Sequence, residues 1–245
     1  MGRTSDAKER LLEAALDLIW ERSYGVVTID NICEAAKVKK GSFYYFFNSK
    51  AELAVATLNN HWANYGRAKW DEMFSPSLPP LVRIRTFMQS VHDSQAEIRA
   101  EYGRVLGCPC FCLGTEVAND DEALRGVAQD ILAKQLRYFE SAIRDAQAEG
   151  VVGAGNASMK ARCLFALFEG SLAQARIQDD LEILRTLPDS AMDLLGVAPA
   201  NIPACLPKVS CAAAASDSTT SKASAPATEV VSAPVSDHSP SLATA

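Results

Sequence analysis

Residues 28–50 read TIDNICEAAKVKKGSFYYFFNSK, and this stretch decides the fold. Thr28 is a good N-cap for a short helix. The apolar residues of that helix recur at helical spacing, at Ile29, Ile32, Cys33 and Ala36. A second short helix is expected from about Lys40 to Phe47. The pattern therefore predicts two short helices joined by a tight turn.

The second of these helices has an unusual composition. Its N-terminal turn combines lysines, a small hydroxyl residue and two tyrosines, which are types that contact phosphates and base edges. Four lysines fall in this part of the chain, where there is no acid: Lys37, Lys39, Lys40 and Lys50. The whole chain has a net charge of −6, so any affinity for nucleic acid must come from this local basic surface. Phe43 and Phe47 are one turn apart and should pack the helix onto its neighbours.

Longer helices are expected on both sides of this pair. The first runs from about Asp6 to Ser23, and Gly25 should close it as a left-handed residue. On the other side, Ser49 can cap a long helix from Lys50 to about Phe74. The first three helices predict a compact helix-turn-helix unit, and the long helix from Lys50 follows it.

The stretch 28–50 resembles the signature of the TetR family of bacterial repressors, which reads roughly T-x-x-x-I-A-x-x-A-G-V-[ST]-x-G-[ST]-[LF]-Y-x-[HY]-F-x-[SN]-K. The resemblance extends outward to the helix from Lys8 and to the long helix after Lys50. Two positions depart from it. Cys33 replaces a usual alanine, and Lys37 stands where glycine is common in the turn, so Lys37 should adopt a left-handed or nearby backbone conformation.

The resemblance implies roles for individual residues. Thr28, Lys40 and Lys50 should hold phosphates, with Tyr44 as a further backbone contact. The residues expected to read base edges or the flanking groove are Lys39, Ser42 and Tyr45. A helix of this kind reads only a few base pairs, so a dimer on a near-palindromic DNA site is expected.

The rest of the chain also reads as helical. Ser75-Pro-Ser-Leu-Pro-Pro marks a break, and no later segment alternates as a strand would. The expected helices run from about Leu81 to Glu101, Asp120 to Glu149, Asn156 to Ile177 and Asp180 to Leu195, the last bent at Pro188. The fold class is all-α, and family resemblance suggests that the last two helices form the dimer surface as a four-helix bundle.

These elements divide the chain into three parts. Residues 5–65 should form the DNA-binding domain, and residues 66–196 an all-α domain for effector sensing and dimerisation. From residue 197 to 245 Ala, Ser, Thr and Pro dominate, with few large apolar side chains. Such a segment buries too little surface to offset its ordering entropy, so a disordered tail is expected.

Cysteines cluster in Gly107-Cys108-Pro109-Cys110-Phe111-Cys112. Pro109 favours the first position of a helix, which makes Cys108 the N-cap. Alternate residues diverge around a helix, so three thiolates would not converge on one ion, and no histidine lies near in sequence. We therefore expect no metal and no other cofactor.

Cys108 alone is a candidate sensor. A thiol at a helix N-terminus feels the positive end of the dipole, which should lower its pKa. The segment resembles the G-C-x-x-x-x-x-x-x-E stretch of a TetR subgroup, some members of which repress electrophile or oxidant defence genes and sense through this cysteine. The stretch from Gly170 to Ile177 resembles the same subgroup, and its Arg176 could approach the thiol. The alternative is that Cys108 is only a small capping residue.

Other functions stay open at this point. The effector could be a small apolar molecule held among Phe87, Met88, Tyr102, Phe111, Phe139 and Phe165, although these residues are equally consistent with plain core. A thiol-dependent enzyme is a second class, but nothing ties a histidine to Cys108, and no catalytic residues are assigned. An all-α interaction module without DNA binding is a third, and the lysine-rich stretch contradicts it.

Two features bear on location. The first helix carries several acids and no cleavage-site pattern, so it is not read as a secretory signal. The longest apolar runs are too short to span a membrane. A cytoplasmic protein without a membrane partner is expected, and its seven cysteines should then be reduced.

Overall fold

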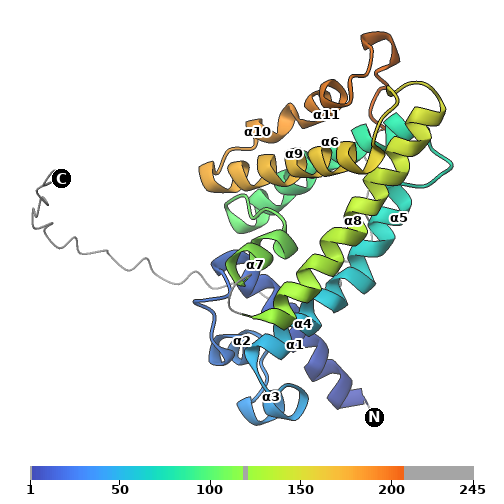
Figure 1. Ribbon diagram of the computed structural model, residues 1–245. Coiled ribbons are helices and arrows are strands. Elements are labelled where there is room, and N and C mark those ends of the chain that lie inside the picture. The colour runs from blue at the N-terminus through green and yellow to red at the C-terminus, as the bar shows by residue number, and fades with distance from the viewer. Residues whose placement is uncertain (1, 118–120, 207–245) are drawn as a thin grey trace, which may run out of the picture. The chain divides into compact units, whose positions relative to one another are not determined.

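The computed structural model describes residues 2–117 and 121–206, and within these ranges every regular element is a helix (Figure 1). This confirms the all-α class. The elements are α1 (Gly2–Arg22), α2 (Ile29–Ala35), α3 (Lys40–Phe46), α4 (Lys50–His61), the π turn η1 (Trp62–Gly66), α5 (Arg67–Met73), α6 (Pro80–Tyr102), α7 (Pro109–Val117), α8 (Glu122–Ala148), α9 (Ala157–Gln178), α10 (Glu182–Arg185), α11 (Leu187–Leu195) and the 3-10 turn η2 (Pro199–Asn201). No helix in the described part of the chain is long and apolar enough to cross a membrane.

Side-chain caps fix where several helices begin. The Thr28 side chain accepts a hydrogen bond from the Asn31 N–H at 3.1 Å, and Ser49 accepts one from the Glu52 N–H at 3.1 Å. Asp121 caps α8 and Asn156 caps α9 in the same way. Each of these side chains satisfies an N–H group that has no partner inside the helix. The caps at Thr28 and Ser49 were predicted, and the structure confirms them.

The end of α1 differs from expectation. The helix stops at Arg22, and the left-handed residue is Ser23, with φ of 95°. Gly25 has no positive φ, so its predicted role was wrong. Instead, the absence of a side chain at Gly25 lets the Glu116 carboxylate come close to the backbone, because a Cβ there would lie 3.1 Å from a carboxylate oxygen of Glu116.

The predicted helix from Lys50 to Phe74 is interrupted. Between α4 and α5 the chain widens into the π turn, which begins at Trp62 and ends at Gly66. A Cβ at Gly66 would come within 2.9 Å of the Trp62 ring, so this turn holds its shape only with glycine there. π turns inside α-helices often lie at functional sites.

Two hydrophobic cores hold the described chain together. The first, which we call the head core, joins α1–α4 to α7 and the start of α8; its largest fully buried side chains are Leu11, Ile32, Phe43, Leu53 and Leu124. The second, the regulatory core, joins α5, α6, the rest of α8, α9 and α11. Trp62 and Cys108 are partly buried and pack against both. The head core therefore extends beyond the predicted boundary at residue 65 and includes part of the second predicted domain.

The predicted tail boundary is placed too early. Val197 is buried, η2 follows it, and Ile202 packs on the regulatory core. The Leu206 N–H donates to the Thr86 hydroxyl at 3.1 Å. Residues 197–206 thus complete the regulatory core, and the remaining part of the predicted tail lies outside the described residues.

Candidate nucleic-acid interface and cysteine cap

Helix α3 presents an aromatic and basic surface. Tyr44 and Tyr45 are 52% and 75% exposed, and Lys39 and Lys40 are also exposed, with Ser42 half-buried. The other face of the helix is closed by Phe43, which is fully buried in the head core. Phe47, just beyond the helix, is also buried, with its ring centroid 5.9 Å from that of Phe43. The two phenylalanines thus hold the helix in place, as predicted, and its tyrosines and lysines are left exposed.

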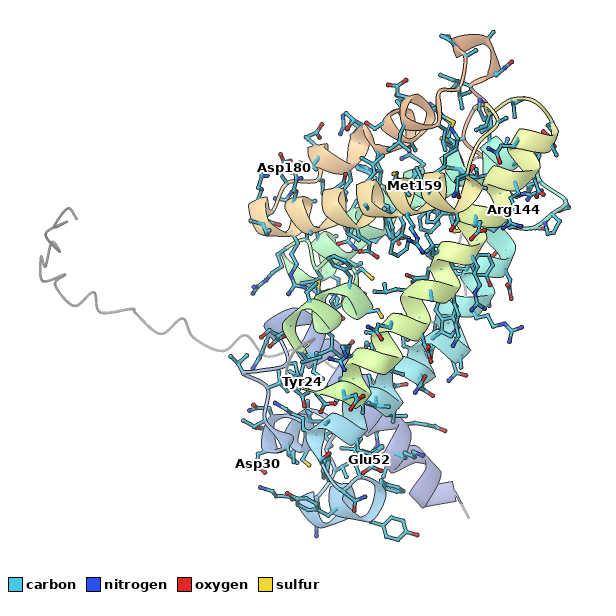
Figure 2. The ribbon with its side chains drawn as sticks, in the orientation of Figure 1. Tyr24, Asp30, Glu52, Arg144, Met159 and Asp180 are labelled. Carbon is cyan, nitrogen blue, oxygen red and sulfur yellow. The ribbon has the colours of Figure 1, made fainter. Side chains whose placement is uncertain are left out.

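Lys40 has a partner that its sequence neighbourhood does not reveal. Its Nζ lies 2.7 Å from a carboxylate oxygen of Asp30, on α2, and this hydrogen bond raises the pKa of Lys40. Figure 2 labels Asp30 beside α3, at the end of the molecule that carries the helix-turn-helix. The lysine-rich stretch contains no acid in sequence, but the folded chain places the carboxylate of Asp30 beside it. A phosphate at Lys40 would have to compete with Asp30.

Thr28 and Lys50 are engaged within the protein. The Thr28 hydroxyl caps α2 and donates to the Asn31 side chain at 2.8 Å. The Lys50 ammonium donates to the main-chain carbonyls of Tyr24 and Val27, both at 2.8 Å, and lies over the Tyr24 ring. Burial lowers the pKa of Lys50. Both side chains organise the loop that carries α2, which leaves Lys50 one N–H donor for a phosphate.

The turn between α2 and α3 has the predicted backbone. Lys37 is left-handed, with φ of 53°, as expected where glycine is common. The Val38 N–H returns to the Cys33 carbonyl at 2.9 Å, and the Arg10 guanidinium donates to the Ala36 carbonyl at 3.0 Å. These bonds hold α3 at a fixed angle to α2 despite the strained residue.

Glu116, at the end of α7, binds the loop that follows α1. Its carboxylate accepts hydrogen bonds from the Ser23 hydroxyl at 3.0 Å, the Tyr24 N–H at 2.9 Å and the Gly25 N–H at 2.6 Å. Figure 2 labels Tyr24 where the helix-turn-helix meets α7. This position is the glutamate of the predicted G-C-x-x-x-x-x-x-x-E stretch. One side chain of α7 therefore fixes the loop that Lys50 also holds.

The residues just before α7 are held from three helices. We call residues 106–112 the cysteine cap. The Trp20 indole, from α1, donates to the carbonyls of Leu106 and Gly107, both at 3.1 Å. Gln95, from α6, accepts from the N–H groups of the same two residues, at 3.1 and 3.0 Å. Arg176, from α9, donates to the Leu106 carbonyl at 2.8 Å. A displacement of the cysteine cap would thus break or move the hydrogen bonds from Trp20, and so shift α1.

Cys108 is the N-cap of α7, as predicted. Helix α7 begins at Pro109, and the Cys108 sulfur accepts the Phe111 N–H at 3.5 Å. The predicted low pKa of this thiol is wrong. The pKa is raised well above its ordinary value, first by burial and then by the charge of Glu169, and the Phe111 N–H offsets only part of this. The helix-terminus effect is present but smaller than the desolvation of the thiolate.

Glu169 is a buried ionisable residue near Cys108 that the sequence pattern alone did not single out. It lies on α9, is 2% exposed, and neither carboxylate oxygen has a hydrogen-bond partner within ordinary geometry. Burial raises its pKa to about 7, and its interaction with the Cys108 thiol is what lowers that value. A signal was available in the sequence. Phe165, Glu169 and Leu172 follow one another at helical spacing, so the carboxylate falls on an otherwise apolar face.

Arg176 approaches a different thiol from the one predicted. Its charge and its hydrogen bond lower the pKa of Cys112, although burial, the largest effect, raises it. The three thiols of the cysteine cap have separate surroundings. The Cys110 sulfur lies 3.7 Å from the Ala128 carbonyl and the Cys112 sulfur 3.8 Å from the Leu106 carbonyl. In the described ranges no three His, Cys, Asp or Glu residues are placed to hold a metal ion.

The residues suggested for an apolar effector belong mainly to the regulatory core. Phe87, Met88 and Phe139 are buried there and pack on one another and on their neighbours. A groove of about 700 Å³ lies elsewhere, between η1 and α5 on one side and α8 on the other. Its lining is aromatic and basic: Trp62, Phe74, Tyr138, Arg67, Lys134 and Arg137.

Comparison with known families gives two matches. Residues 11–57 match a model described as bacterial regulatory proteins, tetR family. Residues 80–189 match a model described as tetracyclin repressor-like, C-terminal domain. The two matches together cover well over half of the chain and include both α3 and the cysteine cap.

Individual proteins are similar over most of their length. The transcriptional regulator AcuR of Cereibacter sphaeroides is 28% identical over 173 residues, which is 70% of this chain and 77% of AcuR. The HTH-type transcriptional repressor NemR of Escherichia coli is 26% identical over 180 residues, 73% of this chain and 88% of NemR.

Solved structures have the same fold. A regulatory protein TetR from Rhodobacter sphaeroides superposes with a TM-score of 0.68 at 28% identity, covering 77% of this chain and 98% of that one. The reduced form of Escherichia coli NemR superposes with a TM-score of 0.70 at 24% identity, covering 79% and 99%.

Proposed function

Because the chain belongs to the TetR family of bacterial transcriptional regulators, we propose that it is a repressor that binds a near-palindromic operator as a homodimer and leaves it when a small electrophile or oxidant modifies Cys108. The chain is a DNA-binding regulator rather than an enzyme. It would act in the cytoplasm, where its operator lies. The observation that carries the proposal is the exposed surface of α3, coupled through α7 to a thiol that packs on both cores.

The DNA contacts would be divided by type. Tyr44 and Lys40 would hold the DNA backbone, with Lys40 exchanging Asp30 for a phosphate. Lys39, Ser42 and Tyr45 would reach base edges or the flanking groove. Thr28 and Lys50 would contribute mainly by fixing the loop that presents α2 and α3, since their polar atoms are already bonded.

The dimer surface would be formed by α9 and α11. Met159 and Ile177 on α9 are 56% and 82% exposed, and their spacing of five turns puts them on one face of the helix. Cys163 is exposed one turn after Met159, and Leu194 is an exposed apolar residue on α11. Exposed large apolar side chains aligned on a helix are typical of a surface that a partner covers. The variants Met159→Asp and Ile177→Asp should sediment as monomers, whereas Val26→Asp, an equally exposed control, should not.

Gel-shift titration tests the DNA contact. The probe is the DNA immediately upstream of the protein's own gene, at physiological salt. Tyr44→Ala should weaken binding about tenfold, the loss expected for one good contact. The matched control is Tyr65→Ala, because Tyr65 is 48% exposed but lies on the π turn. Full affinity in Tyr44→Ala would overturn the contact assignment.

The response to a signal is tested separately. N-ethylmaleimide, a neutral thiol reagent, should release the wild-type protein from the same fragment. It should leave Cys108→Ser bound, although this variant keeps the other free cysteines of the described residues. Release of Cys108→Ser by the reagent, or no release of the wild type once Cys108 is fully modified, would remove Cys108 as the sensor.

A non-covalent effector has a separate candidate site in the groove beside η1. Neither Lys134 nor Arg137 has an ion-pair partner among the described residues, and the only carboxylate in the lining, Asp71, pairs with Arg67 at 3.5 Å. The groove therefore favours an aromatic anion. The fluorescent probe 8-anilinonaphthalene-1-sulfonate should bind there and lose affinity about tenfold in a Lys134→Ala, Arg137→Ala variant. Equal affinity in both proteins would exclude the groove.

A further inference from the structure

The buried pair Cys108 and Glu169 poses a chemical problem for a reactive thiol. A thiol adds to electrophiles as the thiolate, yet burial and a neighbouring carboxylate hold Cys108 in its neutral form. Cys108 packs on the regulatory core, whose members on α9 flank Glu169: Leu164, Phe168 and Leu172. The carboxylate is 2% exposed, and both of its oxygens lack a hydrogen-bond partner. A buried acceptor without a hydrogen-bond partner lowers the stability of the fold, so its presence beside a neutral thiol calls for an explanation.

Among the described residues, the titratable groups that affect the pKa of Cys108 are Glu169, Cys110 and Cys112. From α7, Cys110 and Cys112 feel the charge of Glu169, and both thiols have raised pKa values themselves. In the described part of the chain, the buried polar side chains of α6 and α8 are Arg83, which pairs with Asp145, and the amides of Gln95 and Gln135, which do not act as bases. Arg176, on α9, is bonded to the Leu106 carbonyl.

We propose that Glu169 is the general base that removes the Cys108 thiol proton as the sulfur attacks an electrophile, and that the site selects small, uncharged electrophiles. It rests on the proposed function only in treating Cys108 as the reacting thiol. A carboxyl group whose pKa lies near neutrality is ionised often enough to accept a proton and basic enough to hold it.

The step is balanced without a further reactant. With an activated alkene, the S–H proton moves to a Glu169 oxygen while a sulfur electron pair forms the S–C bond. The alkene π pair moves to the adjacent carbonyl as an enolate. The enolate carbon then takes a proton from Glu169, which returns to the carboxylate. The product is a thioether, and nothing is oxidised or released.

The charge of Glu169 also determines which thiol reagents can reach Cys108. A negative charge in a buried, apolar setting repels an anionic reagent strongly, because little solvent screens it. Size is restricted as well, since Cys108 lies between the two cores. Neutral enones and maleimides fit these conditions, whereas anionic thiol reagents do not.

The test is the rate at which Cys108 is labelled, measured by peptide mass spectrometry on the full chain from pH 5.5 to 9. With N-ethylmaleimide, the wild-type rate should rise with a midpoint near the Glu169 pKa and then level off. In Glu169→Gln the rate at pH 7.5 should fall at least tenfold, and it should rise tenfold for each pH unit without levelling. Glu169→Asp, which keeps a carboxylate with a shorter reach, should recover the midpoint and part of the rate.

Controls separate a base from a merely structural residue. Labelling of Cys205, a half-buried thiol outside α9, should be identical in all variants in the same samples, and Glu149→Gln, at an exposed carboxylate, should behave as the wild type. An anionic reagent, 6-maleimidohexanoate, should label wild-type Cys108 at least tenfold more slowly than N-ethylmaleimide. In Glu169→Gln the two reagents should label Cys108 at similar rates.

Each outcome decides the proposal. An unchanged rate and pH profile in Glu169→Gln would overturn it, as would a Glu169→Asp variant without the midpoint. Labelling needs no DNA, so the result is independent of the operator experiment. If base-assisted labelling is seen but the alkylated protein stays on its operator, Glu169 keeps its role and the sensing function fails.

Discussion

The helix-turn-helix and the cysteine cap both contain helix N-termini, but the local sequence predicts the properties of the first better than those of the second. In the first, Thr28 and Ser49 cap their helices as their residue types and positions predict, and Phe43 closes the inner face of α3. In the second, Cys108 caps α7 as Pro109 predicts, but its pKa moves in the direction opposite to that expected from a helix N-terminus. Backbone geometry follows from neighbours in sequence, whereas the charge state of a buried group follows from neighbours in space.

The largest effect should come from the core of the helix-turn-helix. Phe47→Ala removes a buried ring that packs on Phe43, and cavities of this kind cost about 3 to 5 kcal/mol. Urea unfolding should show this loss, and α3 should lose its DNA affinity with it. Tyr45→Ala, on the exposed side of the same helix, should unfold as the wild type does. Equal stability of the two variants would contradict the assignment of an inner and an outer face.

The next effect should come from Glu169 and depend on pH. Its pKa is raised in the folded protein, so the group contributes most to stability below its ordinary value of 4.5, and that contribution is lost as pH rises through about 7. Glu169→Gln removes the penalty. Relative to the wild type, it should gain about 2 kcal/mol between pH 5 and pH 8 in urea unfolding. If the stability difference is the same at both pH values, the carboxylate does not titrate as the structure implies.

A smaller effect should appear at the junction of the two regions. Glu116→Gln keeps the shape of the side chain but weakens three charge-assisted bonds to the loop at Ser23–Gly25. Because the site is exposed, the cost should be about 1 kcal/mol. The informative result is a loss of coupling, in which alkylation of Cys108 no longer changes operator affinity. Normal release by N-ethylmaleimide in this variant would mean that the signal reaches α3 by another route.

The smallest effect should come from Lys37. Its left-handed backbone suits glycine, so Lys37→Gly should relieve strain and stabilise the protein by less than about 1 kcal/mol. Thermal unfolding should register a slightly higher Tm. Lys39→Gly, two residues later and with an ordinary negative φ, should instead lower it. A destabilised Lys37→Gly variant would show that the lysine side chain, and not the backbone, matters there.

Much of the fold was predictable because its signals are local. Caps, apolar spacing and the glycine-like turn at Lys37 all lie within a few residues of what they determine. The site was predictable in part. The exposed residues of α3 follow from the family pattern, but the partners of Lys40 and Lys50 come from Asp30 and from loop carbonyls that only packing brings near.

The cysteine cap shows the same limit over a longer range. Glu169 lies on a helix far along the chain, and its effect on Cys108 depends on how α7 and α9 pack. The π turn at Trp62 could not be predicted from the sequence either, because the helical pattern continues through it. What distinguishes the turn is the packing of the Trp62 ring against Gly66.

Native mass spectrometry of the protein–DNA complex measures whether two copies of this chain bind one near-palindromic DNA site. With a duplex from upstream of the gene that contains an inverted repeat, the spectrum should show two protomers on one duplex. A duplex with one half-site scrambled should bind far more weakly. One protomer per duplex, or equal binding to the scrambled DNA, would rule out a dimer that reads both half-sites.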